Sequence, residues 1–128
     1  MDNLTLTPRE LKVLKHAKDH GYLQKKFDKE ADLLTHCKTM LGMLGALIVR
    51  EDHVSENGVA DLIICYKGTF IAAELKSING TPTMSQLLFL QKVRKAGGYA
   101  AVCDTVLTLF GLLTSVPHIS DKKQEAQK

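Results

Sequence analysis

The stretch LIICYKGTFIAAELK, residues 62–76, decides the fold that we predict for this chain. Two strand-like runs, residues 62–66 and 69–76, are separated only by Lys67 and Gly68, which is the spacing of a tight β-hairpin. Asp61 begins the first run and Glu74 lies near the end of the second. Antiparallel pairing would therefore bring these two carboxylates to the same end of the ribbon.

Further helices and strands are predicted on both sides of this hairpin. Thr7, Pro8 and Glu10 have the spacing of a capping box at a helix start, and Gly21 is a plausible stop. Apolar spacing and turn residues then predict a helix over 28–44, a strand over 46–50, a helix over 83–96, a strand over 99–103 and a last helix, capped by Asp104, that ends near Leu113. The predicted order is α, α, β, β, β, α, β, α.

Helical spacing also predicts which side of each helix is buried. The predicted buried residues are Leu11, Leu14 and Ala17 in the first helix, Ala31, Leu34, Met40, Leu41 and Leu44 in the second, and Leu87, Leu90 and Val93 in the third. Cys37, Cys65 and Cys103 are far apart in apolar segments, so we expect reduced core thiols rather than a disulfide framework or a zinc site.

Length and composition predict one globular domain. The chain has 128 residues, of which 45% are hydrophobic and 24% charged, and its formal charge of +3 is compatible with a polyanionic partner without proving one. We expect an N-terminal helical segment over 1–26, the main core over 27–114 and a flexible C-terminal tail over 115–128. The chain lacks an apolar stretch of membrane-spanning length and an apolar N-terminal signal, so we expect an intracellular, cytoplasmic protein.

Asp61, Glu74 and Lys76 form the chemically informative group. Side chains alternate along a strand, so Glu74 and Lys76 share one face while Leu75 points to the other. Mg²⁺ prefers oxygen ligands and often takes only one or two protein carboxylates, and a nearby ammonium stabilises phosphate charge. By itself this spacing is weak support for a metal site, because Glu74 and Lys76 could be solvent-facing residues of an edge strand and Asp61 a turn residue.

A wider pattern resembles a known family. The segment GVADLII at 58–64, the triplet at 74–76 and Thr83-x-x-Gln86, which opens a helix ending in Ala-Gly-Gly at 96–98, resemble the VRR-NUC family. These are virus-type replication and repair nucleases of the PD-(D/E)XK superfamily, and the resemblance spans about residues 30–113. It implies an α/β, restriction-endonuclease-like core with a central mixed β-sheet of about four strands flanked by helices.

The resemblance also implies an activity and a site. It implies a Mg²⁺-dependent DNA endonuclease, with Mn²⁺ as a substitute, that hydrolyses phosphodiester bonds. By position, Asp61, Glu74 and the backbone carbonyl of Leu75 would bind the metal, and Lys76 would be the catalytic cation. The proline that usually precedes the aspartate is Ala60 here, which alters backbone shape rather than chemistry.

Two further residues enter the predicted site only through the resemblance. Glu30 maps to a glutamate that can point at the metals, and Gln86 maps to a glutamine on the helix after the motif. Each has a simpler interpretation: Glu30 as a favourable acidic residue in the first turn of a helix, and Gln86 as an exposed helix residue.

The resemblance further implies branched DNA, such as a Holliday junction, as substrate and a homodimer as the active form, in viral or phage-type replication and repair. The DNA-binding candidates are Lys25, Lys26, Lys29, Arg50 and His53, although loop histidines and surface lysines are common without any function. Two rival interpretations are a non-catalytic nucleic-acid-binding module and an interaction protein that uses the apolar helix at 107–113. Burial of that helix would exclude the second.

Overall fold

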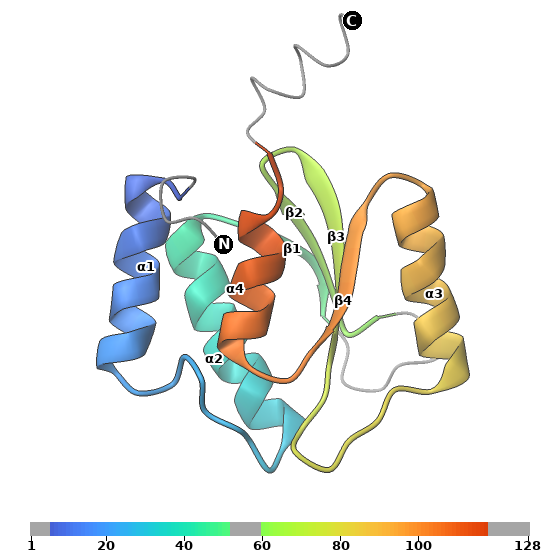
Figure 1. Cartoon of the computed structure of the whole chain (residues 1–128), viewed down its shortest axis with the longest axis horizontal. Helices are drawn as coiled ribbons and strands as arrows, with labels where there is room; N and C mark the ends of the chain where they lie inside the picture. Colours follow the sequence, from blue (N-terminus) through green and yellow to red (C-terminus); the bar gives the residue numbers. More distant parts are fainter. Residues whose placement is uncertain (1–5, 52–59, 118–128) are drawn as a thin grey trace, which may run out of the picture.

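A mixed β-sheet forms the middle layer of the fold in a computed structural model that describes residues 6–51 and 60–117 (Figure 1). Within these residues the sheet has four strands in the order β1-β2-β3-β4. The β1–β2 and β2–β3 pairs are antiparallel, and the β3–β4 pair is parallel. The strands are β1 (Leu47–Glu51), β2 (Leu62–Tyr66), β3 (Thr69–Leu75) and β4 (Tyr99–Cys103). The predicted α/β fold with a mixed sheet is confirmed.

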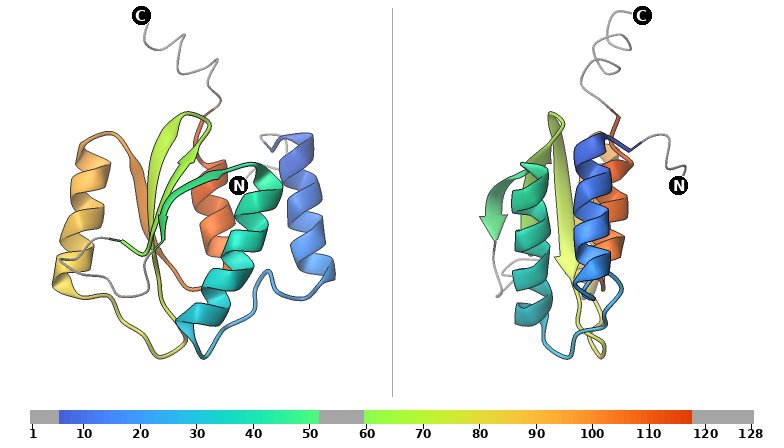
Figure 2. Two further views of the ribbon diagram at one scale, coloured as in Figure 1. Left: turned by 180° about the vertical axis from the view of Figure 1, so that it is seen from behind. Right: turned by 90° about the vertical axis from the view of Figure 1, so that its left-hand side faces the viewer.

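Helices cover both faces of the sheet. Figures 1 and 2 show α1, α2 and α4 on one face and α3 on the other. In the described part of the chain none of the helices is long and apolar enough to cross a membrane. The helices are α1 (Pro8–Asp19), α2 (Glu30–Leu44), α3 (Met84–Lys95) and α4 (Val106–Thr114), so the predicted order of elements is confirmed.

Alternation along the hairpin strands builds a core on each side of the sheet. Leu62 and Ile64 point into the larger cluster with α2 and α4, whereas Ile63 belongs to the smaller cluster with α3. In α4, Leu109 and Phe110 are also buried in the larger cluster. Each such side chain stabilises the fold by about 1.5–3 kcal/mol. Because the apolar side of α4 is buried inside the domain, the interaction-protein interpretation of residues 107–113 is wrong.

Some predicted buried positions are wrong. Leu11 and Leu87 are exposed, by 43% and 42%, and the neighbouring polar residues Glu10 and Gln86 are buried instead. Both polar side chains accept hydrogen bonds from backbone N–H groups in capping boxes, so burial does not leave them unsatisfied. A pattern based on hydrophobicity alone therefore misses these two polar positions, whereas Ala17, Leu90 and Val93 are buried as predicted.

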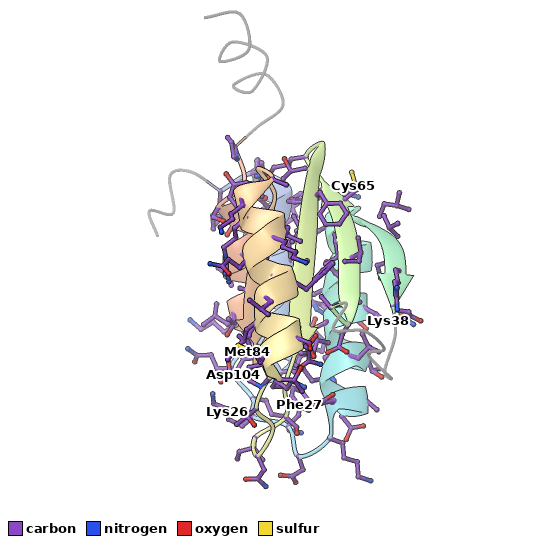
Figure 3. The ribbon with its side chains drawn as sticks, turned by 90° about the vertical axis from the view of Figure 1, so that its right-hand side faces the viewer. Lys26, Phe27, Lys38, Cys65, Met84 and Asp104 are labelled. Atoms are coloured by element: carbon purple, nitrogen blue, oxygen red, sulfur yellow. The ribbon has the colours of Figure 1, made fainter. Side chains whose placement is uncertain are left out.

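Three other details also differ from the sequence prediction. Ala31 is exposed, and the buried side of α2 includes Leu33 and Cys37 instead. The cap of α4 is Thr105 rather than Asp104, although Asp104 lies beside it. Cys65 is exposed, so it is not a core thiol, whereas Cys37 and Cys103 are buried as expected. Cys65 lies on the face of the sheet that α3 covers, but α3 packs over β3 and β4 and leaves Cys65 of β2 uncovered (Figure 3).

A buried ion pair joins the first helix to the hairpin turn. Glu10 is fully buried, and one of its carboxylate oxygens, Oε2, lies 2.9 Å from Lys67 Nζ and accepts a hydrogen bond of 2.7 Å from the Tyr66 hydroxyl. Lys67 adopts a left-handed backbone conformation, with φ of 53°. Leu6, Val13 and Ala17 also enter the larger hydrophobic cluster. The N-terminal helix therefore completes the same core that supports the hairpin.

Candidate active site

The hairpin register brings the two predicted carboxylates together. Leu62 pairs with Ala73, so Asp61 lies opposite Glu74 at the end of the ribbon away from the turn. Asp61 Oδ2 accepts a 2.8 Å hydrogen bond from the backbone N–H of Leu75. This bond fixes Asp61 against the end of β3, and the predicted juxtaposition of Asp61 and Glu74 is confirmed.

Both carboxylates are buried, which excludes the edge-strand interpretation. Glu74 is 1% exposed and Asp61 is 6% exposed. Strand β3 lies between β2 and β4, and Glu74 pairs in register with Val102 of β4. Burying a charged group away from water is costly unless a partner compensates for it. Two adjacent buried carboxylates are therefore a feature that the fold maintains at a cost to stability.

Lys76 is the cation beside this pair. Its Nζ lies 3.3 Å from Glu74 Oε2 and 3.7 Å from Glu30 Oε1, and its side chain is 13% exposed. Its backbone N–H donates to the carbonyl of Cys103 at 3.0 Å, which extends the parallel ladder by one residue beyond β3. The predicted grouping of Asp61, Glu74 and Lys76 is therefore present, and Glu30 lies beside it at the start of α2.

Gly80 allows this close packing, and sequence reasoning did not assign it a role. A Cβ at position 80 would lie 3.3 Å from Lys76 Cδ and 3.5 Å from Glu30 Oε1. The first separation is tighter than ordinary van der Waals contact, so a larger residue would press on the lysine. Its position in a short loop between Lys76 and α3 was the available signal, but a loop glycine by itself indicates only a turn.

The electrostatics of the pair favour a bound cation. Burial, followed by the negative charge of Asp61, raises the pKa of Glu74 to about 7. Burial also raises the pKa of Asp61, against the lowering effect of the Leu75 hydrogen bond. Two neighbouring carboxylates that resist joint ionisation share a proton or bind a cation. Nearby Lys76 lowers both pKa values but does not cancel the effect of burial.

One carboxylate oxygen of the pair lacks a hydrogen-bond partner among the described residues. Within the described residues, Glu74 Oε1 is buried and has no hydrogen-bond partner. The same residues contain no group of three or more His, Cys, Asp or Glu side chains placed to hold a metal ion. Two buried carboxylates with a vacant acceptor oxygen fit Mg²⁺, which commonly binds one or two protein carboxylates and keeps several waters. The donor set is of the kind that Mg²⁺ takes, and the metal itself stays a prediction.

Comparison with known proteins agrees with this arrangement at the level of the fold. A solved structure described as a VRR_NUC domain aligns with 67% of this chain and 94% of its own length, with a TM-score of 0.53 and 23% sequence identity. The chain has the VRR_NUC fold. No family profile and no curated protein matches the chain. The fold that the sequence resemblance implied is thus confirmed.

Glu30 and Gln86, the two residues predicted only through the resemblance, lie in different surroundings. Glu30 is in the first turn of α2 and also approaches Lys76, so it lies beside the candidate site, and its role as a metal ligand stays a prediction. Gln86 is 6% exposed, which contradicts the exposed-helix interpretation. Its Oε1 accepts a 2.8 Å hydrogen bond from the backbone N–H of Thr83, and Thr83 Oγ1 accepts from the N–H of Gln86. These contacts give Gln86 a structural role at the start of α3.

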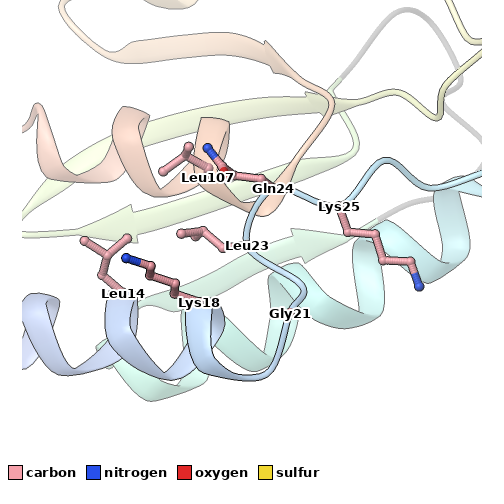
Figure 4. A pocket seen from close by; sticks show the side chains of 7 residues that line it. All are labelled: Leu14, Lys18, Gly21, Leu23, Gln24, Lys25 and Leu107. Atoms are coloured by element: carbon pink, nitrogen blue, oxygen red, sulfur yellow. The ribbon is translucent and has the colours of Figure 1, made fainter.

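The predicted DNA-binding lysines are dispersed along the α1–α2 connection. Lys25 lies over the ring of Phe27, 5.3 Å from its centroid, and lines a pocket with Leu14 and Leu107 (Figure 4). Lys29 is the residue that precedes α2, and its side chain makes no capping hydrogen bond. Lys26 forms an ion pair with Asp104, and both lie at the same end of the molecule as Met84, the first residue of α3 (Figure 3).

The two remaining predicted DNA contacts come from the strand and loop before Asp61. Arg50 is an exposed residue of β1, next to a bulge in the β1–β2 pairing. His53 lies outside the described residues. The DNA contacts of the lysines and Arg50 stay predictions, since surface cations are common on helices and edge strands.

Proposed function

We propose that this chain is a metal-dependent DNA endonuclease that hydrolyses phosphodiester bonds. The observation that carries the proposal is the pair of buried carboxylates, Asp61 and Glu74, with Lys76 Nζ 3.3 Å from Glu74. The VRR_NUC fold on which they lie supports the same class of chemistry. The buried Glu74 Oε1, which has no hydrogen-bond partner among the described residues, supports a bound ligand at this position.

Each residue has a distinct role in this proposal. Asp61, Glu74 and the backbone carbonyl of Leu75 would hold Mg²⁺, or Mn²⁺ in its place, and Glu30 would be an additional ligand at the start of α2. When bound, the ion would polarise the phosphodiester and supply an activated water. Lys76 places an ammonium beside the metal-binding carboxylates, where it stabilises negative charge on the phosphate. Gln86 positions the start of α3 next to this end of the sheet.

The substrate and the assembly are also proposals. We infer that the enzyme acts on branched DNA, such as a four-way junction, in replication or repair, and that it works as a homodimer. Symmetrical cutting of a four-way junction requires two active sites related by a twofold axis, which a homodimer provides. Arg50 and the lysines at 25, 26 and 29 are the proposed contacts to the DNA backbone, together with His53.

The test is a cleavage assay on labelled four-way junction, flap and linear duplex DNA, with Mg²⁺, with Mn²⁺ or with chelator. We expect metal-dependent cutting that Asp61→Asn, Glu74→Gln and Lys76→Met each reduce by about 100-fold or more, with DNA binding retained. The isosteric Asp61 and Glu74 variants remove charge while keeping the size of each side chain. Gel filtration of the wild-type protein measures the oligomeric state separately.

A matched control comes from another ion pair of the chain. Lys15 and Asp19 lie 2.6 Å apart on the exposed surface of α1, and Asp19→Asn removes one negative charge far along the chain from the site. This variant should cut at the wild-type rate. Unchanged cutting by the three site variants would contradict the assignment of these residues. Metal-independent binding without cutting of any substrate would instead favour the non-catalytic binding module.

A further inference from the structure

A polar pocket adjoins the candidate active site. It has a volume of about 430 Å³, within the range of pockets that hold small ligands, and Lys76 forms part of its wall. Ser77, Gly80 and Asp104 add polar groups and backbone, and Ile78 and Val102 add apolar surface. Lys26 completes the lining. The pocket therefore lies beyond the carboxyl ends of the parallel strands β3 and β4, where open α/β sheets bind their ligands.

Backbone hydrogen bonds hold the wall of this pocket in place. The N–H of Ile78 donates to the carbonyl of Phe27 at 2.8 Å, and the N–H of Leu107 donates to the carbonyl of Leu23 at 2.9 Å. These bonds attach the α1–α2 connection to the loop after β3 and to the start of α4. Lys26 is consequently held at the pocket by the residues around it, although its own side chain is 54% exposed.

The Lys26 ammonium forms an ion pair with a carboxylate. Lys26 Nζ lies 2.6 Å from Asp104 Oδ2, and the other Asp104 oxygen accepts a 3.1 Å hydrogen bond from the Thr108 hydroxyl. The Asp104 side chain is 49% exposed. An ion pair this open to water is weak, since solvent competes for both charges. A phosphate, which offers several acceptor oxygens, can replace the carboxylate as the partner of Lys26.

We propose that this pocket is a subsite for the nucleotide adjacent to the cleaved phosphate, and that Asp104 is a negative residue that weakens DNA binding there. Lys26 exchanges Asp104 for a DNA phosphate, while the sugar or base of that nucleotide packs against Ile78 and Val102. The inference rests on the proposed nuclease function, because it places the subsite next to Lys76. To the proposed contact of Lys26 with the DNA backbone it adds a pocket for the neighbouring nucleotide and an opposing charge, Asp104.

A merely structural ion pair and a phosphate subsite make different predictions for two variants. Asp104→Asn keeps an oxygen that can accept from Thr108 but frees the Lys26 charge, so DNA affinity should rise by about fivefold. Lys26→Ala removes the phosphate contact, so affinity should fall by about fivefold and the slope of log affinity against log salt should decrease by about 0.9 on duplex DNA. If the pair only fastened the loop, both variants would change affinity in the same direction or not at all.

The experiment measures fluorescence anisotropy of labelled four-way junction and duplex DNA in chelator, so that binding is separated from cutting. Asp19→Asn is the matched control, because it frees Lys15 from an ion pair of the same 2.6 Å length and makes the same change in net charge. Its affinity should remain at the wild-type value. Lys26→Arg should keep the DNA affinity that Lys26→Ala loses, since arginine retains the positive charge.

Opposite changes for Asp104→Asn and Lys26→Ala, with no change for Asp19→Asn, would support the subsite. Equal increases for Asp104→Asn and Asp19→Asn would overturn it, because they would reflect net charge alone. Loss of affinity in both pocket variants, or no DNA binding by the wild-type protein, would also overturn it. The nuclease proposal is tested separately, by cutting in Mg²⁺ with the Asp61, Glu74 and Lys76 variants.

Discussion

Replacing Glu74 by glutamine should change how the stability of the metal-free protein depends on pH. Glu74 is 1% exposed and next to Asp61, which raises its pKa from 4.5 to about 7 in the folded chain. The folded state therefore binds this proton more tightly than the unfolded chain. The resulting stabilisation is complete below pH 4.5 and is lost as the pH rises through 7. Glu74→Gln has no proton to lose at this position.

The size of the effect follows from the two pKa values. A rise from 4.5 to about 7 corresponds to a free energy of about 3 kcal/mol, at 1.36 kcal/mol for each pKa unit. The proton belongs to the Asp61–Glu74 pair, so this value describes their combined site. Relative to wild type, the free energy of unfolding of Glu74→Gln should thus increase by about 3 kcal/mol between pH 4.5 and pH 8.

Urea unfolding followed by far-UV circular dichroism measures this difference, since the chain contains no tryptophan for fluorescence. The measurements should be made in chelator from pH 4.5 to pH 8, with Asp19→Asn as the surface control. Adding Mg²⁺ at pH 8 should stabilise wild type by mass action and leave Glu74→Gln nearly unchanged. Parallel pH curves for wild type and Glu74→Gln would refute the proposed proton site, and equal stabilisation by Mg²⁺ would refute Glu74 as a ligand.

Two further variants test how the fold supports the site. Gln86→Ala removes half of the capping box of α3 and should lower the free energy of unfolding, measured by urea unfolding, by about 1 kcal/mol. An unchanged free energy of unfolding would mean that the contact of Gln86 with Thr83 does not stabilise the helix. Lys67→Ala leaves the buried carboxylate of Glu10 without its ammonium and should lower the free energy of unfolding by about 3 kcal/mol. Lys15→Ala, which breaks an exposed ion pair, should lower it by less than about 1 kcal/mol. Similar decreases in the two lysine variants would contradict the importance of burial.

The order of the helices and strands could be predicted from local sequence patterns. The spacing around Lys67 and Gly68 sets the hairpin, and the hairpin register alone places Asp61 opposite Glu74. Side-chain alternation then places Lys76 on the face of Glu74. These relationships involve residues close together in the chain, so they depend on strand geometry and turn length rather than on distant contacts.

The buried positions within helices were less predictable because polar residues can be buried when their hydrogen bonds are satisfied. Glu10 and Gln86 occupy positions that a hydrophobic pattern assigns to Leu11 and Leu87. In both cases the capping box was visible in the sequence, but the depth of burial depends on the strands and helices packed against it. For Glu10 the decisive partners are Tyr66 and Lys67, which lie more than 50 residues away.

The sequence by itself determined the hairpin, the carboxylate pair and the lysine beside it, because all three follow from the geometry of neighbouring strands. Only the tertiary structure decided that Glu74 is buried, since its burial depends on β4, α3 and the β2–β3 pair together. The tertiary structure also decided the ion pairs of Glu30 and Asp104. Both reach their lysine partners across separate elements, and charges distant in sequence meet only when the whole chain has packed.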